Sequence, residues 1–160
     1  MASFAYEGAL RRALVQLKYG GAARLAEPLA SAAAPTVREL LGLARQQALV
    51  PVPIHPTRLR ERGYNQAALL ARSIGRIAGL PVRELIGRMR ETTKQHRLDR
   101  TARLRNLRQA FVVARGRDPP RSVLLVDDIL TTSATLEACA AALIEAGVRE
   151  VYGFAVAREV

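Results

Sequence analysis

The segment VLLVDDILTTSAT, from Val123 to Thr135, decides the fold expected for this chain. Its four consecutive apolar residues, Val123 to Val126, are typical of a strand covered on both faces. A polar turn follows, then an alanine-rich helix over residues 135–146 that Gly147 stops, and then a second strand at residues 151–157. This order is a βαβ unit, and it predicts an α/β fold with a mainly parallel central sheet flanked by helices.

The polar part of this segment has the chemistry of a phosphate and sugar site. Its turn consists of Thr131, Thr132, Ser133, Ala134 and Thr135. Backbone N–H groups and hydroxyls at the start of a helix attract an anion, because the helix dipole is positive there. Asp127 and Asp128 would repel a bare phosphate, so we expect them to face sugar hydroxyls or a magnesium ion shared with phosphates. Ligands on such sheets bind beyond the carboxyl ends of the strands, where this turn belongs.

Hydrophobic spacing predicts the remaining elements. Helices are expected over residues 9–19, 25–43 and 64–78, with Pro35 as a break or kink in the second. Short strands are expected at residues 48–54 and 85–89, and the basic stretch from His55 to Gly63 is interpreted as a loop. The charged stretch over residues 90–108 is interpreted as a mobile basic loop or a short exposed helix.

Length and composition bound the class of protein. With 160 residues, of which 49% are hydrophobic, we expect one domain over residues 1–160, with a helical arm over about 1–47. No apolar run approaches a membrane span, and the first residues lack the apolar core of a signal peptide, so a soluble cytoplasmic protein without membrane insertion is expected. The one cysteine, Cys139, is predicted to be a buried small hydrophobe, so that any metal must bind through oxygen ligands.

The charge balance favours anionic partners. Lysine and arginine total 25 against 14 acidic residues, giving +11, and the excess is spread over much of the chain. A phosphate-rich small molecule, nucleic acid, and a genome that favours arginine codons all remain open explanations. Aromatic content of 4%, with no tryptophan, argues against a groove that stacks single-stranded bases, although phosphate contacts remain open.

Several motifs resemble known families. The segment from Val123 to Thr135 resembles the thirteen-residue signature of type I phosphoribosyltransferases. The stretches LKY (17–19), PVP (51–53) and RGYNQ (62–66) resemble the ComF competence-protein family. The same resemblance extends over Gln95, Leu98, Arg103, Asn106 and Phe111 in their spacing, so that it covers nearly the whole chain.

The resemblance implies a type I phosphoribosyltransferase fold with a small hood and a site for 5-phosphoribosyl pyrophosphate with Mg²⁺. Asp127 and Asp128 would contact the ribose hydroxyls and would meet the metal indirectly or through the substrate, and the turn at 131–135 would hold the 5-phosphate. Pyrophosphate would lie against Pro53, Ile54, His55, Arg58, Arg62 and Lys18, with a cis peptide at Val52-Pro53. A closing hood loop would bring the catalytic residues Lys94, Arg97 and Arg103.

The implied activity is transfer of the phosphoribosyl (pentosyl) group to an unknown acceptor, as in glycosyltransferases, in a protein associated with natural competence and DNA uptake. The alternative is a non-catalytic factor that senses phosphoribosyl pyrophosphate or assists single-stranded DNA uptake. Partners would be single-stranded DNA or competence-machinery proteins, and a homodimer is considered.

Three departures from the family patterns carry their own expectations. Ser133 replaces a glycine, so a backbone angle open only to glycine is not expected there; either a right-handed conformation or one of the exceptions known for Asn-like residues is expected. Thr131 replaces the aspartate of hypoxanthine-guanine transferases, which disfavours purine salvage. The cysteine-rich zinc module that precedes LKY in ComF-like proteins is expected to be absent.

Overall fold

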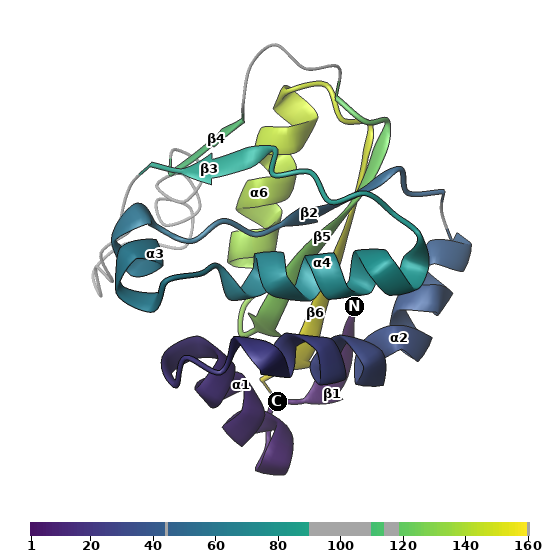
Figure 1. Ribbon diagram of the computed structural model, residues 1–160. Helices are drawn as coiled ribbons and strands as arrows, with labels where there is room; N and C mark the ends of the chain where they lie inside the picture. Colours follow the sequence, from purple (N-terminus) through teal and green to yellow (C-terminus); the bar gives the residue numbers. More distant parts are fainter. Residues whose placement is uncertain (44, 90–109, 114–118, 160) are drawn as a thin grey trace.

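The computed structural model describes residues 1–43, 45–89, 110–113 and 119–159. Four parallel strands form the main sheet, in the order β1 (Ala2–Ala5), β6 (Glu150–Arg158), β5 (Ser122–Leu130) and β2 (Ala48–Pro51). A separate antiparallel pair consists of β3 (Ile86–Arg88) and β4 (Phe111–Val113). The helices are α1 (Gly8–Tyr19), α2 (Ala26–Leu43, after a 3₁₀ turn, Ala23–Leu25), α3 (Pro56–Arg62), α4 (Gln66–Ala78) and α6 (Ala134–Glu145). Figure 1 shows the sheet between α6 and the pair α2 and α4.

The two faces of the sheet carry two separate hydrophobic cores, because successive side chains of a strand point to opposite faces. On one face, Leu124 and Val126 of β5 pack with Phe154 of β6 against α1, α2 and α4. On the other, Val123 and Leu125 pack against α6 and the β3–β4 pair. All five of these side chains are at most 1% exposed. The predicted α/β class, with a central parallel sheet flanked by helices, is confirmed, and β5 is an inner strand, as its apolar run indicated.

Most of the predicted helices and strands are found close to their expected positions. Helix α2 continues through Pro35 to Leu43, so the proline does not break it. Cys139 is fully buried on α6, as predicted. No helix within the described ranges is long and apolar enough to cross a membrane.

The stretch after β2 was predicted as a basic loop, and this prediction is wrong: it contains helix α3. His55 caps the helix, since its Nδ1 accepts a hydrogen bond from the Thr57 N–H at 3.2 Å. Pro56 occupies the first helical turn, and Gly63, with φ of 82°, ends the helix in the left-handed conformation. Pro56 at the start and Gly63 at the end were both visible in the sequence, but the high charge of the segment led to its interpretation as a loop.

Two further differences concern strands. Strand β1 was not predicted, because its four residues are too few to show periodicity; its partner is β6, with Ala2 opposite Ala155. Strand β5 was expected to end at Val126, but it runs on to Leu130 because β6 continues alongside it, with Ile129 opposite Ala157. Both aspartates therefore belong to the strand and not to the turn.

Replacing Gly75 with alanine is expected to destabilise the protein by about 1 to 3 kcal/mol, although alanine favours helices. A Cβ atom on Gly75, in α4, would lie 2.7 Å from the Leu80 carbonyl oxygen and 3.2 Å from Val82 Cγ2. Gly42 in α2 is the matched control, because nothing lies within 4 Å of its Cβ position. Gly42→Ala is expected to stabilise by about 0.5 kcal/mol. Urea unfolding measures both, and equal effects would contradict the close contact at Gly75.

Candidate functional site

The acidic pair on β5 divides between the two faces of the sheet. Asp128 continues the face of Leu124 and Val126, while Asp127 continues the opposite face, towards α6. Asp128 is 2% exposed and Asp127 is half-buried. The Asp127 carboxylate accepts a hydrogen bond from the Asp128 N–H at 2.8 Å. The two acids are thus adjacent in the chain but meet different surroundings.

Asp128 is paired with a cation from a distant part of the chain. Lys18, in the last turn of α1, places its Nζ 3.1 Å from Asp128 Oδ2. Within the described residues this buried oxygen has no hydrogen-bond partner, so the ion pair with Lys18 is its polar contact. A buried carboxylate needs such a partner, because an unpaired buried charge is strongly unfavourable.

Asp127, unlike Asp128, has no cation within ion-pair distance among the described residues, and its environment disfavours the charged form. Burial, and then the neighbouring charge of Asp128, raise the pKa of Asp127 well above its ordinary value of 3.8. Burial, followed by the charge of Asp127, raises the pKa of the Cys139 thiol to about 12. Asp127 therefore holds its proton to higher pH than an ordinary aspartate, and Cys139 stays an unreactive thiol.

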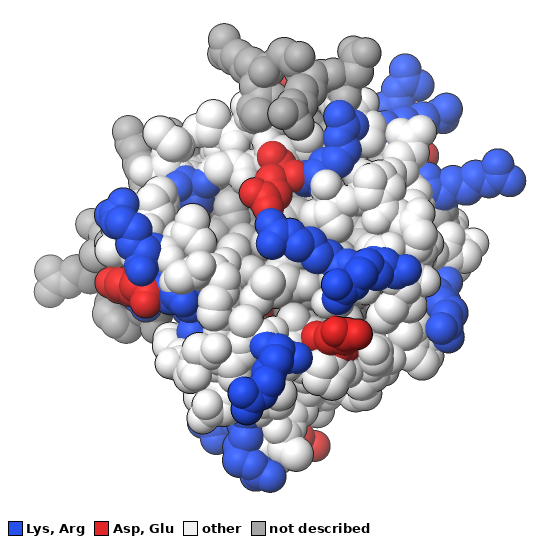
Figure 2. Space-filling view, viewed as in Figure 1, with Lys and Arg blue, Asp and Glu red and all other residues white. Residues whose placement is uncertain are grey.

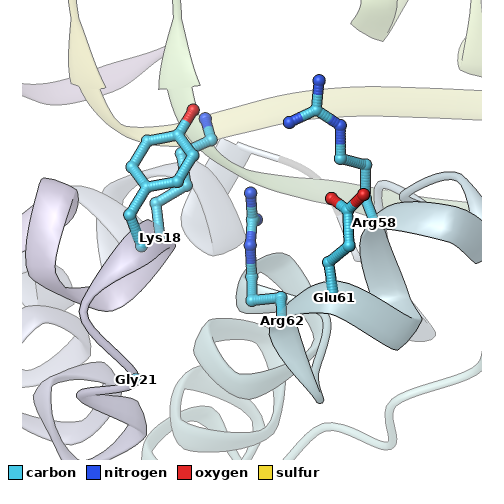
Figure 3. Close-up of a pocket in the computed structure, with 6 residues that line it drawn as sticks. Lys18, Gly21, Arg58, Glu61 and Arg62 are labelled. Atoms are coloured by element: carbon cyan, nitrogen blue, oxygen red, sulfur yellow. The ribbon is translucent and has the colours of Figure 1, made fainter.

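A pocket of about 300 Å³ opens next to this pair, between the end of α1 and helix α3. It is lined by Lys18, Tyr19, Gly21, Arg58, Glu61 and Arg62. Figure 3 shows the side chains of Lys18, Arg58 and Arg62 converging on one open space, with Glu61 beside them. Three cations against one carboxylate make this pocket suited to an anion carrying more than one charge.

The last residue of α3 and the segment that follows it hold this pocket in shape. The Arg62 guanidinium lies over the Tyr19 ring, 5.3 Å from its centroid, and donates a hydrogen bond to Gln66. Asn65 caps α4 by accepting from the Ala67 N–H at 3.0 Å and donates through Nδ2 to the Val52 carbonyl, also at 3.0 Å. The RGYN motif thereby joins the end of α1, the loop after β2 and the start of α4.

The hydroxyl turn lies at the carboxyl end of β5, where it was predicted. Thr131, Thr132 and Ser133 are exposed, and α6 begins at Ala134. Ser133 has φ of −65° and ψ of −8°, which is the right-handed one of the two conformations expected where the signature has glycine. The Ser133 hydroxyl donates to Glu137 rather than capping the helix. The first N–H groups of α6 have no carbonyl partner within the helix, as an anion site requires.

The residues predicted to hold pyrophosphate are only partly brought together. Lys18, Arg58 and Arg62 line one pocket, whereas Pro53, Ile54 and His55 are not among its lining residues. Pro53 is buried and His55 is the cap of α3. The cis peptide expected at Val52-Pro53 is wrong, because every described peptide bond is trans. The predicted catalytic residues Lys94, Arg97 and Arg103 lie outside the described residues.

Three pocket residues were not predicted as site residues: Tyr19, Gly21 and Glu61. Tyr19 belongs to the LKY motif, so the motif itself was the available signal. No sequence pattern singled out Glu61, which lies between two arginines in α3.

Comparison with curated proteins finds several similar competence proteins. The chain is 36% identical over 115 residues to competence protein F of Haemophilus influenzae, an alignment that covers 70% of this chain and 50% of that protein. It is 29% identical over 157 residues to competence protein ComFC of Streptococcus pneumoniae, covering 98% of this chain and 67% of that protein. The chain is a homologue of the ComF competence proteins.

This ComF homologue is also 33% identical over 118 residues to the DNA utilization protein YhgH of Escherichia coli K12, covering 71% of the chain and 50% of YhgH. It thus spans about half to two thirds of the length of these relatives. No protein-family model matches it.

Two solved structures are similar in outline. A Leishmania donovani UMP synthase shares 17% identity with a TM-score of 0.43, covering 91% of this chain and 23% of that one. A structure described as the allosteric regulatory enzyme of purine biosynthesis shares 17% identity with a TM-score of 0.48, covering 88% and 29%.

Proposed function

We propose that this ComF homologue binds 5-phosphoribosyl pyrophosphate with magnesium at the carboxyl edge of its sheet. One observation carries the proposal: Lys18 lines the cationic pocket and at the same time contacts Asp128 at the end of β5. The pocket, the acid and the turn that follows it on the same strand are therefore parts of one site. A ligand with a pyrophosphate at one end, a diol in the middle and a phosphate at the other fits this order of groups.

In this proposal different residues bind different parts of the ligand. Lys18, Arg58 and Arg62 neutralise the pyrophosphate, and the acids on β5 accept hydrogen bonds from the ribose hydroxyls. The turn at 131–135 and the start of α6 hold the 5-phosphate.

Magnesium fits this site only as part of the ligand. No group of three or more acidic, histidine or cysteine side chains that could hold a metal is found among the described residues. Mg²⁺ is commonly held by one or two carboxylates together with substrate phosphates, which is what Asp127 and Asp128 offer. The ion would add positive charge where the leaving pyrophosphate gains negative charge.

The associated activity would be transfer of the phosphoribosyl group. The bond from ribose C1 to pyrophosphate breaks, the acceptor's attacking atom bonds to C1, and the acceptor's proton is released. The chain's own contribution is to position the ligand and stabilise charge. The acceptor is unknown, and catalytic roles for Lys94, Arg97 and Arg103 stay predictions. The names of the relatives support a setting in competence and DNA use.

Calorimetric titration of phosphoribosyl pyrophosphate with Mg²⁺ into the wild type tests the proposal directly. Saturable binding at one site that requires Mg²⁺ is expected, and ribose 5-phosphate and pyrophosphate should each bind more weakly than the whole ligand. Absence of binding by the wild type would refute it.

Replacing Arg58 with glutamine is expected to weaken this binding roughly tenfold, which corresponds to about 1.4 kcal/mol. Arg58 is exposed, lines the pocket and, within the described part of the chain, has no ion-pair partner, so its charge is available to the ligand. Arg60 lies two residues away on α3 and does not line the pocket, which makes Arg60→Gln the matched control with an expected change below about twofold. Equal effects of the two changes, measured by the same titration, would mean that only net charge matters.

A second candidate function is a non-catalytic factor that binds single-stranded DNA. The formal charge of +11 supports it, and Figure 2 shows Lys and Arg side chains spread over the visible face with few acidic ones between them. Binding to an oligonucleotide should then weaken steeply as salt rises, since phosphate contacts release counterions. Undetectable binding at low salt would exclude direct DNA contact.

A further inference from the structure

The end of helix α1 is fastened to the segment that joins α3 to α4. The Tyr64 hydroxyl donates a hydrogen bond to the Leu17 carbonyl, 47 positions earlier in the chain. The guanidinium of Arg62, the last residue of α3, lies over the Tyr19 ring. The residues on both sides of Lys18 are therefore held, while Lys18 itself reaches across to Asp128.

This fastening acts on the backbone from which Lys18 extends. Carbonyls in the last turn of a helix lack intrahelical partners, and the Tyr64 hydroxyl supplies one of them. The Leu17 side chain is fully buried in the core, which fixes the rotation of the helix end. A lysine side chain has a long flexible stem and loses much conformational entropy when it is held. Because the backbone at residue 18 is fixed, the Lys18 ammonium group can reach fewer positions.

Tyr64 does not itself belong to the pocket. It is absent from the lining residues and packs, half-buried, against the core beneath α1 and α4. Any influence of its hydroxyl on a ligand must therefore pass through another residue. The adjacent residue, Asn65, donates to the carbonyl of Val52, and the Val52 N–H in turn donates to the Val126 carbonyl of β5, so the segment that carries Tyr64 is linked to the sheet.

We propose that Tyr64 is a positioning residue, whose hydroxyl keeps the Lys18 ammonium group at Asp128 and in the pocket. Its effect on ligand affinity rests on the proposed binding of phosphoribosyl pyrophosphate. Its effect on Lys18 does not, because the hydrogen bond and the ion pair exist in the ligand-free protein.

The ligand-free test is the NMR signal of the Lys18 ammonium group after ¹⁵N-lysine labelling. Lys18 and Lys94 are the two lysines in the chain, so Lys18→Met assigns the signal by removing it. An ammonium held by a buried carboxylate exchanges slowly with water, and Asp128→Asn should abolish its signal. Tyr64→Phe, which removes only the hydroxyl, is expected to broaden or abolish the signal, whereas Tyr152→Phe, the matched control on β6, should leave it intact. An unchanged signal in Tyr64→Phe would overturn the inference.

The ligand test is a double-mutant cycle on affinity. Tyr64→Phe is expected to weaken binding of phosphoribosyl pyrophosphate with Mg²⁺ about fivefold, a change of about 1 kcal/mol. The same change in a Lys18→Met background is expected to have no further effect, because the residue through which Tyr64 acts is gone. A fivefold loss in both backgrounds would indicate a general structural role and overturn the inference. If the wild type binds no ligand, the proposed function fails, and the ammonium signal alone still decides the role of Tyr64.

Discussion

Replacing Lys18 with methionine is expected to destabilise the folded protein by about 2 to 3 kcal/mol. The Asp128 side chain is 3% exposed and its Oδ2 lies 3.1 Å from Lys18 Nζ, so the change leaves a buried carboxylate without a counter-charge. Methionine retains much of the apolar stem, and packing is therefore largely preserved. The expected loss is smaller than for a fully buried pair because the Lys18 side chain is 26% exposed and water reaches its ammonium group. Chemical unfolding in urea measures the change.

The control variant for this prediction also removes the negative charge of Asp128. Lys18→Met combined with Asp128→Asn should recover most of the lost stability, because no ionised group then remains buried. Arg72→Met provides a second comparison, since Arg72 pairs with Glu84 at 3.0 Å but both side chains are more than half exposed. It should stay within about 0.5 kcal/mol of the wild type. If Lys18→Met cost no more than Arg72→Met, the Lys18–Asp128 pair would not have the buried character assigned to it.

The order of the acids and hydroxyls at the sheet edge could be predicted from sequence because these residues are close together in the chain. A run of four apolar residues, two acids and a hydroxyl turn lie within thirteen positions, and a strand followed by a helix fixes their order at the sheet edge. The residue type at Ser133 excluded a conformation open only to glycine, and the structure shows the right-handed one of the two remaining alternatives. The parallel sheet followed from the alternation of apolar runs and helical patterns.

What could not be predicted depends on partners distant in the chain. The extension of β5 through both acids is set by β6 alongside it, and it sends Asp127 and Asp128 to opposite faces. The ion pair of Lys18 joins positions 110 residues apart, and no periodicity reports such a contact. Tyr64 is similar, because its motif was visible but its contact with Leu17 was not. Sequence patterns therefore located the groups, and the tertiary structure decided which of them meet.

Replacing both Asp127 and Asp128 with asparagine is expected to weaken binding of phosphoribosyl pyrophosphate with Mg²⁺ by at least about a hundredfold. Hydrogen bonds to charged groups each contribute about 1.5 to 3 kcal/mol, and about 2.7 kcal/mol corresponds to a hundredfold change. Asparagine keeps the shape of aspartate, and circular dichroism would verify that the sheet is retained. The two single variants separate the contributions, because Asp128 also holds Lys18 whereas Asp127 does not.

The direction of this change in affinity distinguishes specific contacts from a general effect of charge. The ligand is an anion, so removing two carboxylates near it would strengthen binding if only overall charge mattered. Glu61→Gln tests that case, because Glu61 lines the cationic pocket and has no ribose or metal role in the proposal. It is expected to tighten binding by about twofold or threefold through reduced repulsion. Weaker binding in the double asparagine variant and in Asp127→Asn, which leaves the Lys18–Asp128 pair in place, together with tighter binding in Glu61→Gln would support specific contacts of the β5 acids with hydroxyls or magnesium. Tighter binding in both would assign the β5 acids no ligand contact and leave Asp128 only its role as the partner of Lys18.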